Sequence, residues 1–212
     1  MRKFFALDSP LMIALSSLAD LVFCNILFCL CSLPLFTAGA ALTALYDCTF
    51  SIVEEREDPL IVRQFWRSFR NNFKRGTALG LICAGVFAFL GAYYLVVGAL
   101  PAALQRTYRI TFLVLALLWL AVFQYLFPLQ AKFHMKVGQT VKTAALLSAT
   151  ALPWTLASLA VTAGAMYLSF FMNPDGLWIA LFLWFTVVIA VVAYLNSFLL
   201  RQAFKRLAPG HS

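Results

Sequence analysis

Residues 33–46 have the sequence LPLFTAGAALTALY, and residues 65–74 have the sequence FWRSFRNNFK. The first stretch ends one apolar helix and begins another, since Pro34 and Gly39 favour a tight turn between them. The second stretch combines basic residues with aromatic residues at helical spacing, which is typical of a helix that lies along a bilayer. Together they predict apolar helices joined by an amphipathic elbow at about residues 60–75.

The composition excludes a soluble globular protein. Of the 212 residues, 63% are hydrophobic and only 11% are charged, and the mean hydropathy is +0.89. Too little polar surface is available to cover such a chain in water. The apolar segments lack the alternation typical of a membrane barrel. The sequence therefore predicts an all-α, polytopic transmembrane helical bundle that forms a single domain over residues 1–212.

Hydropathy in windows of about 19 residues predicts spans at about 11–33, 77–99, 110–129, 144–171 and 177–200. Residues 37–53 form a further apolar segment that is only just long enough to cross. The number of spans is therefore six or five. We also expect Pro153 to bend the long span in which it lies, because proline removes one backbone hydrogen bond.

The distribution of basic residues favours six spans. Lys and Arg close to span ends favour the cytoplasm. With six spans, only Arg106 and Arg109 of the 16 basic residues lie outside, whereas five spans also place Arg2 and Lys3 there. Both termini are then predicted to be cytoplasmic.

The elbow at residues 60–75 is basic on one side and aromatic on the adjacent side. A net charge of +8 without a polar basic domain favours anionic lipid headgroups over nucleic acid as the partner. Two interpretations stay open, namely a helix that rests on lipid and positions the next span, and a docking helix for a partner protein. The candidate contact residues are Arg63, Arg67, Arg70 and Lys74 on the basic side, and Phe65, Trp66, Phe69 and Phe73 on the aromatic side.

Small residues recur where the elbow enters the next span. Gly76 and Gly80 are separated by three residues, a spacing that lets two helices approach closely in a membrane. We expect this contact to form within the chain rather than between two copies.

Several polar residues lie at membrane depth, where each is costly unless it faces protein or water. Hydrogen bonding between helices is the favoured role for all of them, and binding of a cation or proton is the alternative for the two acids. The residues are Asp20, Asn25, Asp47, Gln124 and Asn196.

Catalytic and metal-binding patterns are scarce. Four of the eight acidic residues lie between positions 54 and 58, which is typical of a solvated turn. His134 and His211 are isolated, and no metalloprotease, nucleophile-elbow or phosphate-loop motif is present. The five cysteines fall in or beside apolar helices and are interpreted as packing residues. We therefore expect a protein that is not an enzyme and has no catalytic residue, metal site or cofactor.

The motif around the turn resembles a known family. Its residues are Asn25 in the first span, then Pro34, Thr37, Gly39, Ala40 and Ala41, and Asn72 in the elbow. Over about residues 20–80 this pattern resembles the YesL family of bacterial membrane proteins, a domain of unknown function.

The resemblance implies a multi-pass protein of the bacterial cytoplasmic membrane. Because members of that family often accompany carbohydrate ABC importers and sensor kinases, it also implies an accessory or regulatory role in sugar uptake, with a transporter or kinase subunit as the partner. It implies no catalytic or ligand residues. The alternative is a small transporter or channel in its own right, which the intramembrane polar residues and the bend at Pro153 favour.

Overall fold

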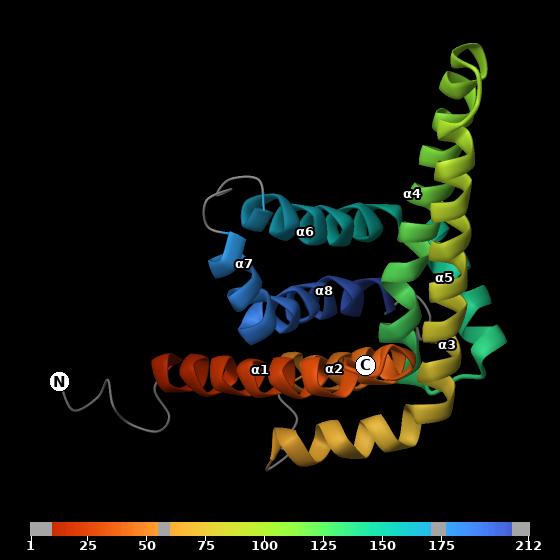
Figure 1. Cartoon of the computed structure of the whole chain (residues 1–212). Helices are drawn as coiled ribbons and strands as arrows, with labels where there is room; N and C mark the ends of the chain where they lie inside the picture. Colours follow the sequence, from red (N-terminus) through yellow and green to blue (C-terminus); the bar gives the residue numbers. More distant parts are fainter. Residues whose placement is uncertain (1–9, 55–59, 171–176, 205–212) are drawn as a thin grey trace.

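The computed structural model describes residues 10–54, 60–170 and 177–204, which contain helices and turns but no strand. Figure 1 shows the arrangement of these helices. In chain order they are α1 (Pro10–Ser32), a short 3-10 turn (Leu35–Thr37), α2 (Ala38–Val53), α3 (Ile61–Gly98), α4 (Ala102–Phe133), α5 (Val137–Thr150), α6 (Leu152–Phe170), α7 (Leu177–Leu183), a π-helical segment (Trp184–Val188) and α8 (Ile189–Phe204).

The all-α class predicted from the sequence is confirmed. Within the described residues, five helices are long and apolar enough to cross a membrane, and there are up to six if the bent pair of α5 and α6 counts as one span. Residues 1–9 and 205–212, whose cytoplasmic location the sequence predicts, lie outside the described residues.

Helix α2 lies at the centre of the bundle, where it packs against α1, α3, α4 and α8. In the apolar 18-residue stretch of Leu35–Val53, 67% of the residues are buried, whereas the corresponding stretches of the other four unbroken candidates are 17–22% buried. Its small residues make this possible, since Ala40, Ala41 and Ala44 have no exposed surface. Residues 37–53, which by sequence are only just long enough to cross a membrane, thus form the central helix of the core.

The closest approach between α2 and α3 depends on glycine. A Cβ atom added at Gly39 would overlap the carbonyl oxygen of Gly76 and lie 2.8 Å from the Cα atom of Gly80. A Cβ atom added at Gly76 would lie 2.6 Å from the Cα atom of Ala40. Every neighbour here is backbone, which cannot move aside without moving its helix. The predicted packing of the Gly76 and Gly80 pair within the chain is therefore confirmed.

Helix α3 combines the predicted elbow and the predicted third span in one element. Figure 1 shows it turning sharply after a first part that runs beside α2, and then continuing beside α4 beyond the other helices. We call residues 61–75 the elbow helix, and the remainder of α3 together with α4 the long hairpin.

The elbow helix runs antiparallel along α2 over most of its length. Cys48 Sγ lies 4.0 Å from the carbonyl oxygen of Ile61, and Gln64 Nε2 donates to Ser51 Oγ at 2.5 Å. At the other end, Gly76 contacts Gly39. The sequence placed one of these segments across the membrane and the other along its surface. The structure packs the two segments side by side, and Leu35–Val53 is among the helices that are long and apolar enough to cross a membrane.

The predicted span at 144–171 is two helices. Helices α5 and α6 meet at a bend of 99°, so residues 144–150 belong to α5 and α6 begins at Leu152. The bend predicted at Pro153 is present, with the proline in the first turn of α6, where its missing N–H leaves no helical acceptor unpaired. The hydroxyl of Thr155 in α6 donates to the carbonyl oxygen of Ser148, near the end of α5, at 3.2 Å.

Candidate functional site

The basic residues predicted for the elbow helix all lie on its exposed surface, facing away from α2. They are Arg63, Arg67, Arg70 and Lys74. Four cations on one face, on a helix whose opposite face is buried, give a strongly positive surface strip. We call this strip the elbow face.

The predicted aromatic residues of the elbow divide into exposed and buried positions. Trp66 and Phe73 are 46% and 38% exposed, and both pack edge-on against the half-buried Phe69, at ring-centroid distances of 5.8 Å and 5.6 Å. Phe65 differs from the expectation, because none of its surface is exposed. It belongs to the core shared with α2 and is not available to lipid or to a partner.

Buried polar residues line the inner side of the elbow helix, and one of them, Gln64, bonds it to α2. Gln64 Nε2 donates to Ser51 Oγ and also to the backbone carbonyl of Asp47 at 3.3 Å. Asn72, which the family motif includes, is completely buried, and its amide donates to the carbonyl oxygen of Ser68 at 3.2 Å. The elbow face is therefore presented by a helix that polar contacts hold in place.

A hollow of about 540 Å³ lies where α3 bends. Its lining residues are Arg70, Asn71, Phe73, Lys74 and Arg75. Arg75 is held from the other side, since its Nη1 donates to the carbonyl oxygen of His134 at 2.5 Å. His134 ends α4 in a left-handed conformation with φ of 49°. We call this feature the bend hollow, and sequence reasoning missed both it and Arg75.

The ends of α2, α4 and α8 converge on the same region of the molecule. Lys132 Nζ lies 2.5 Å from Glu54 Oε1 in a partly buried ion pair and 5.3 Å from the centre of the Phe50 ring. Arg201 donates to the carbonyl oxygen of Val53 at 3.4 Å. These contacts bring together segments that the charge distribution assigned to one side of the membrane.

The motif residues of the first turn have structural roles. Thr37 Oγ1 donates to the carbonyl oxygens of Cys31 and Pro34 at 2.5 Å and 2.7 Å, which closes the turn between α1 and α2. Gly39 and Ala40 make the close contact with α3, and Ala41 is buried beside them. Nothing in this geometry resembles a ligand site.

Asn25 binds the π-helical segment. It is completely buried, and its amide donates to the carbonyl oxygens of Trp184 and Phe185 at 3.1 Å and 2.5 Å. Its Oδ1 accepts a hydrogen bond from the backbone N–H of Ala190 at 2.8 Å. A π-helical turn disrupts the regular backbone bonding of an α-helix, and Asn25 pairs with backbone groups at both ends of this turn. The predicted role as a structural hydrogen-bonding residue fits this arrangement.

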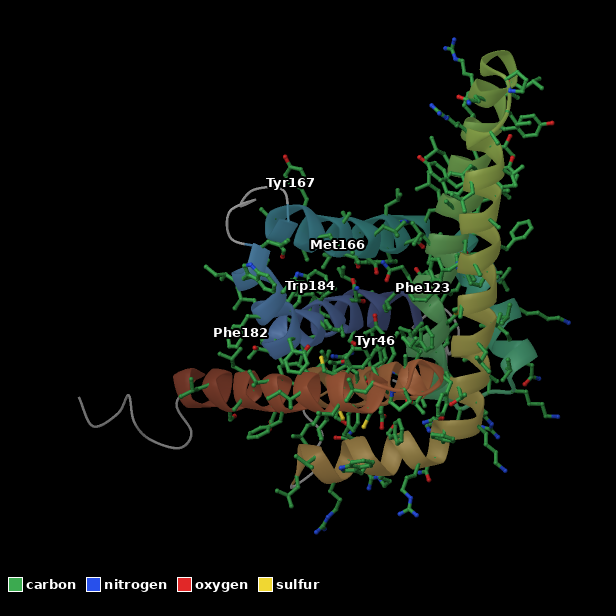
Figure 2. The ribbon with its side chains drawn as sticks, in the orientation of Figure 1. Tyr46, Phe123, Met166, Tyr167, Phe182 and Trp184 are labelled. Atoms are coloured by element: carbon green, nitrogen blue, oxygen red, sulfur yellow. The ribbon has the colours of Figure 1, made fainter. Side chains whose placement is uncertain are left out.

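Asn196 belongs to a chain of buried polar side chains between α2, α4, α6 and α8. Its Oδ1 accepts a hydrogen bond from Ser158 Oγ at 3.0 Å, and its Nδ2 donates to Thr162 Oγ1 at 3.2 Å. Gln124 donates to the same Thr162 oxygen at 3.1 Å. Tyr46 interacts with Asn196 from α2, and Figure 2 shows it on the inner side of the bundle. We call this group the polar seam.

The two acids that the sequence predicts at membrane depth are not part of the polar seam. Asp20 and Asp47 are both half-buried and both lie within electrostatic range of Cys48. Across the described ranges, no group of three or more His, Cys, Asp or Glu residues is arranged to hold a metal ion. The five cysteines are free thiols, of which Cys24, Cys48 and Cys83 are buried.

Comparison with known proteins identifies related sequences whose function is not known. Residues 21–94 match the family described as "Protein of unknown function, DUF624". The chain is similar to "Uncharacterized protein YteU" of Bacillus subtilis (strain 168), with 26% identity over 143 residues, which are 66% of this chain and 63% of that protein. No solved structure matches the chain. The match at 21–94 includes most of α1 and α3 and all of α2, so it contains both the glycine contact and the elbow helix.

Proposed function

We propose that this protein is a non-catalytic accessory or regulatory protein of the bacterial cytoplasmic membrane, and that its elbow face docks onto a partner protein at the membrane surface. One observation carries the proposal. A helix whose inner side is fixed to the core presents Arg63, Arg67 and the exposed ring of Trp66 outward together. Arginine and tryptophan are enriched at the energetic centres of protein interfaces.

The charge of the elbow face favours a partner with an acidic surface. A strip of four exposed cations attracts a partner surface rich in carboxylates, and such charge complementarity mainly accelerates association and gives specificity. The resemblance to the YesL family supports a subunit of a carbohydrate ABC importer or a sensor kinase as that partner. The same resemblance supports the proposal that this protein acts in carbohydrate uptake.

Affinity purification from the native host tests the docking proposal. Tagged wild-type protein and the Arg63→Glu/Arg67→Glu variant are purified in mild detergent and compared by quantitative mass spectrometry. The matched control is Arg106→Glu/Lys142→Glu, which makes the same charge change at exposed positions away from the elbow helix.

We expect transporter or kinase subunits to be enriched with the wild type and with the control, and to be lost from the elbow variant. An unchanged melting temperature of the elbow variant shows that the loss does not come from unfolding. Equal enrichment with all three proteins would refute docking through the elbow face.

The polar seam favours a second candidate function, a small transporter or channel. Four helices contribute hydrogen-bonding side chains to one buried line, and polar residues at membrane depth often mark solute or proton pathways. Purified protein in liposomes would then carry a proton or Na⁺ flux that Ser158→Ala or Thr162→Val, both in the polar seam, abolishes. Liposomes without any flux above protein-free vesicles would exclude this candidate for those two ions.

A further inference from the structure

We propose that the bend hollow binds the phosphate of an anionic phospholipid headgroup. This inference goes beyond the proposed function, because it assigns a discrete lipid site to the C-terminal end of the elbow helix, where Arg70 and Lys74 belong both to the elbow face and to the lining of the hollow. It rests on the charge of the hollow, on its fixed position and on its depth in the membrane.

The lining of the bend hollow matches the chemistry of a phosphodiester. Arg70, Lys74 and Arg75 supply three cationic side chains, and Asn71 supplies an amide donor. The lining includes no acidic residue. Charge-assisted hydrogen bonds from guanidinium and ammonium groups to phosphate oxygens are the strong kind. A volume of about 540 Å³ is also sufficient for a glycerophosphate headgroup.

Contacts with α4 and α2 hold the Arg75 end of the lining in place. Arg75 donates to the His134 carbonyl, so one wall of the hollow is tied to the end of α4. The next residue, Gly76, is in backbone contact with α2. A site whose side chains are already positioned loses less conformational entropy when its ligand binds.

The long hairpin places the bend hollow at headgroup depth. Between Arg75 and Tyr93, 18 residues of helix rise by about 27 Å, close to the roughly 30 Å thickness of the hydrocarbon core. At the far end, Tyr93 donates to the carbonyl oxygen of Tyr108 at 3.4 Å, and the exposed Arg106 and Arg109 lie nearby in sequence. Tyrosine and arginine are typical of a membrane interface. We therefore infer that the bend lies at the opposite interface.

Apolar surface beside the bend hollow favours a lipid over a free phosphate ion. Phe73 is part of the lining and is 38% exposed. Two turns further along α3, Leu81 and Ile82 are also exposed. A headgroup in the hollow would thus have its acyl chains beside apolar side chains, whereas a soluble anion would gain nothing from them.

Native mass spectrometry of the purified full-length protein tests the proposal. The protein is titrated with phosphatidylglycerol, with phosphatidylcholine, and with soluble glycerol 3-phosphate as the free-anion probe. The test variant is Arg70→Gln/Lys74→Gln, which leaves the Arg75 contact in place. The matched control is Arg106→Gln/Lys142→Gln, which removes two exposed cations elsewhere.

We expect phosphatidylglycerol to bind more tightly than phosphatidylcholine, and the test variant to weaken it by about tenfold or more, as removal of two surface cations predicts. Equal binding of the two lipids, or an equal loss in the control variant, would overturn the site. Glycerol 3-phosphate that competes as well as the lipid would overturn its assignment to a lipid. Arg63→Glu/Arg67→Glu, which leaves every residue of the hollow's lining in place, should bind phosphatidylglycerol as the wild type does even where it loses the partner protein, so failure of one proposal is distinguishable from failure of the other.

Discussion

The contact between α2 and α3 predicts opposite effects for the same substitution at different positions of one helix. In Gly76→Ala the new Cβ atom would lie 2.6 Å from Ala40 Cα, whereas ordinary contacts lie at 3.4–4 Å. The two backbones must therefore separate by about 1 Å, since neither can yield locally. Overpacking of this kind costs about 1–3 kcal/mol, and Gly39→Ala, which overlaps a carbonyl oxygen, should fall at the upper end.

The same helix supplies the control. A Cβ atom added at Gly85 or Gly91 would have no neighbour within 4 Å. Alanine at these positions should leave stability unchanged or raise it by up to about 1 kcal/mol, because alanine has the higher helix propensity. All four variants change glycine to alanine, so effects on the unfolded chain largely cancel in the comparison.

Thermal unfolding in detergent measures the difference. Buried thiols at Cys24, Cys48 and Cys83 become reactive toward a fluorogenic maleimide only when the core opens. For a protein of this size, 1 kcal/mol corresponds to about 2–4 °C in melting temperature, so Gly76→Ala should melt roughly 2–12 °C below the wild type. Equal melting temperatures for Gly76→Ala and Gly85→Ala would refute the close-contact argument.

Two further predictions concern buried hydrogen bonds and use the same unfolding assay. Asn25→Leu leaves backbone groups of the π-helical segment unpaired and should lower the melting temperature by several degrees, because each unsatisfied buried group costs about 1–3 kcal/mol. Asn71→Leu, which makes the same change at an exposed position, should leave the melting temperature unchanged. Tyr125 and Thr155 hydroxyls lie 2.8 Å apart in the core, so Thr155→Val and Tyr125→Phe should each destabilise the protein. The double variant should lose less stability than the two single variants lose together. A loss equal to their sum would show that the two hydroxyls do not interact.

The sequence predicted the turn and helix contacts that depend on special backbone chemistry. Glycine at position 39, and the spacing of Gly76 and Gly80, indicated close helix packing because only the absence of a Cβ atom permits it. Pro153 indicated the bend between α5 and α6. Pro128, however, lies inside the continuous helix α4. A proline therefore shows where one backbone bond is missing, but tertiary packing decides whether the helix breaks there.

The inward side of the elbow helix could not be predicted from its own pattern. A helical wheel places Gln64, Ser68 and Asn72 with polar residues, which suggests exposure. In the structure all three are buried, because α2 packs against this side of the elbow helix; Gln64 bonds to Ser51 of α2, and Asn72 bonds to Ser68 within the elbow helix. Phe65 is buried by the same pairing. The π-helical segment and the bend hollow have no local sequence signal, since both arise from contacts between residues far apart in the chain.

The pairing of α2 with the elbow helix also decides how the hydropathy of α2 is interpreted. Considered alone, α2 is apolar enough to cross a membrane. It is packed antiparallel to a helix with four exposed cations, and each of these would cost about 2.5–3.5 kcal/mol at the centre of a bilayer. A total of roughly 10 kcal/mol or more exceeds what the paired helices could recover through packing. We therefore expect the elbow helix to keep its basic face at the membrane surface and to hold α2, which packs against it, close to the same depth.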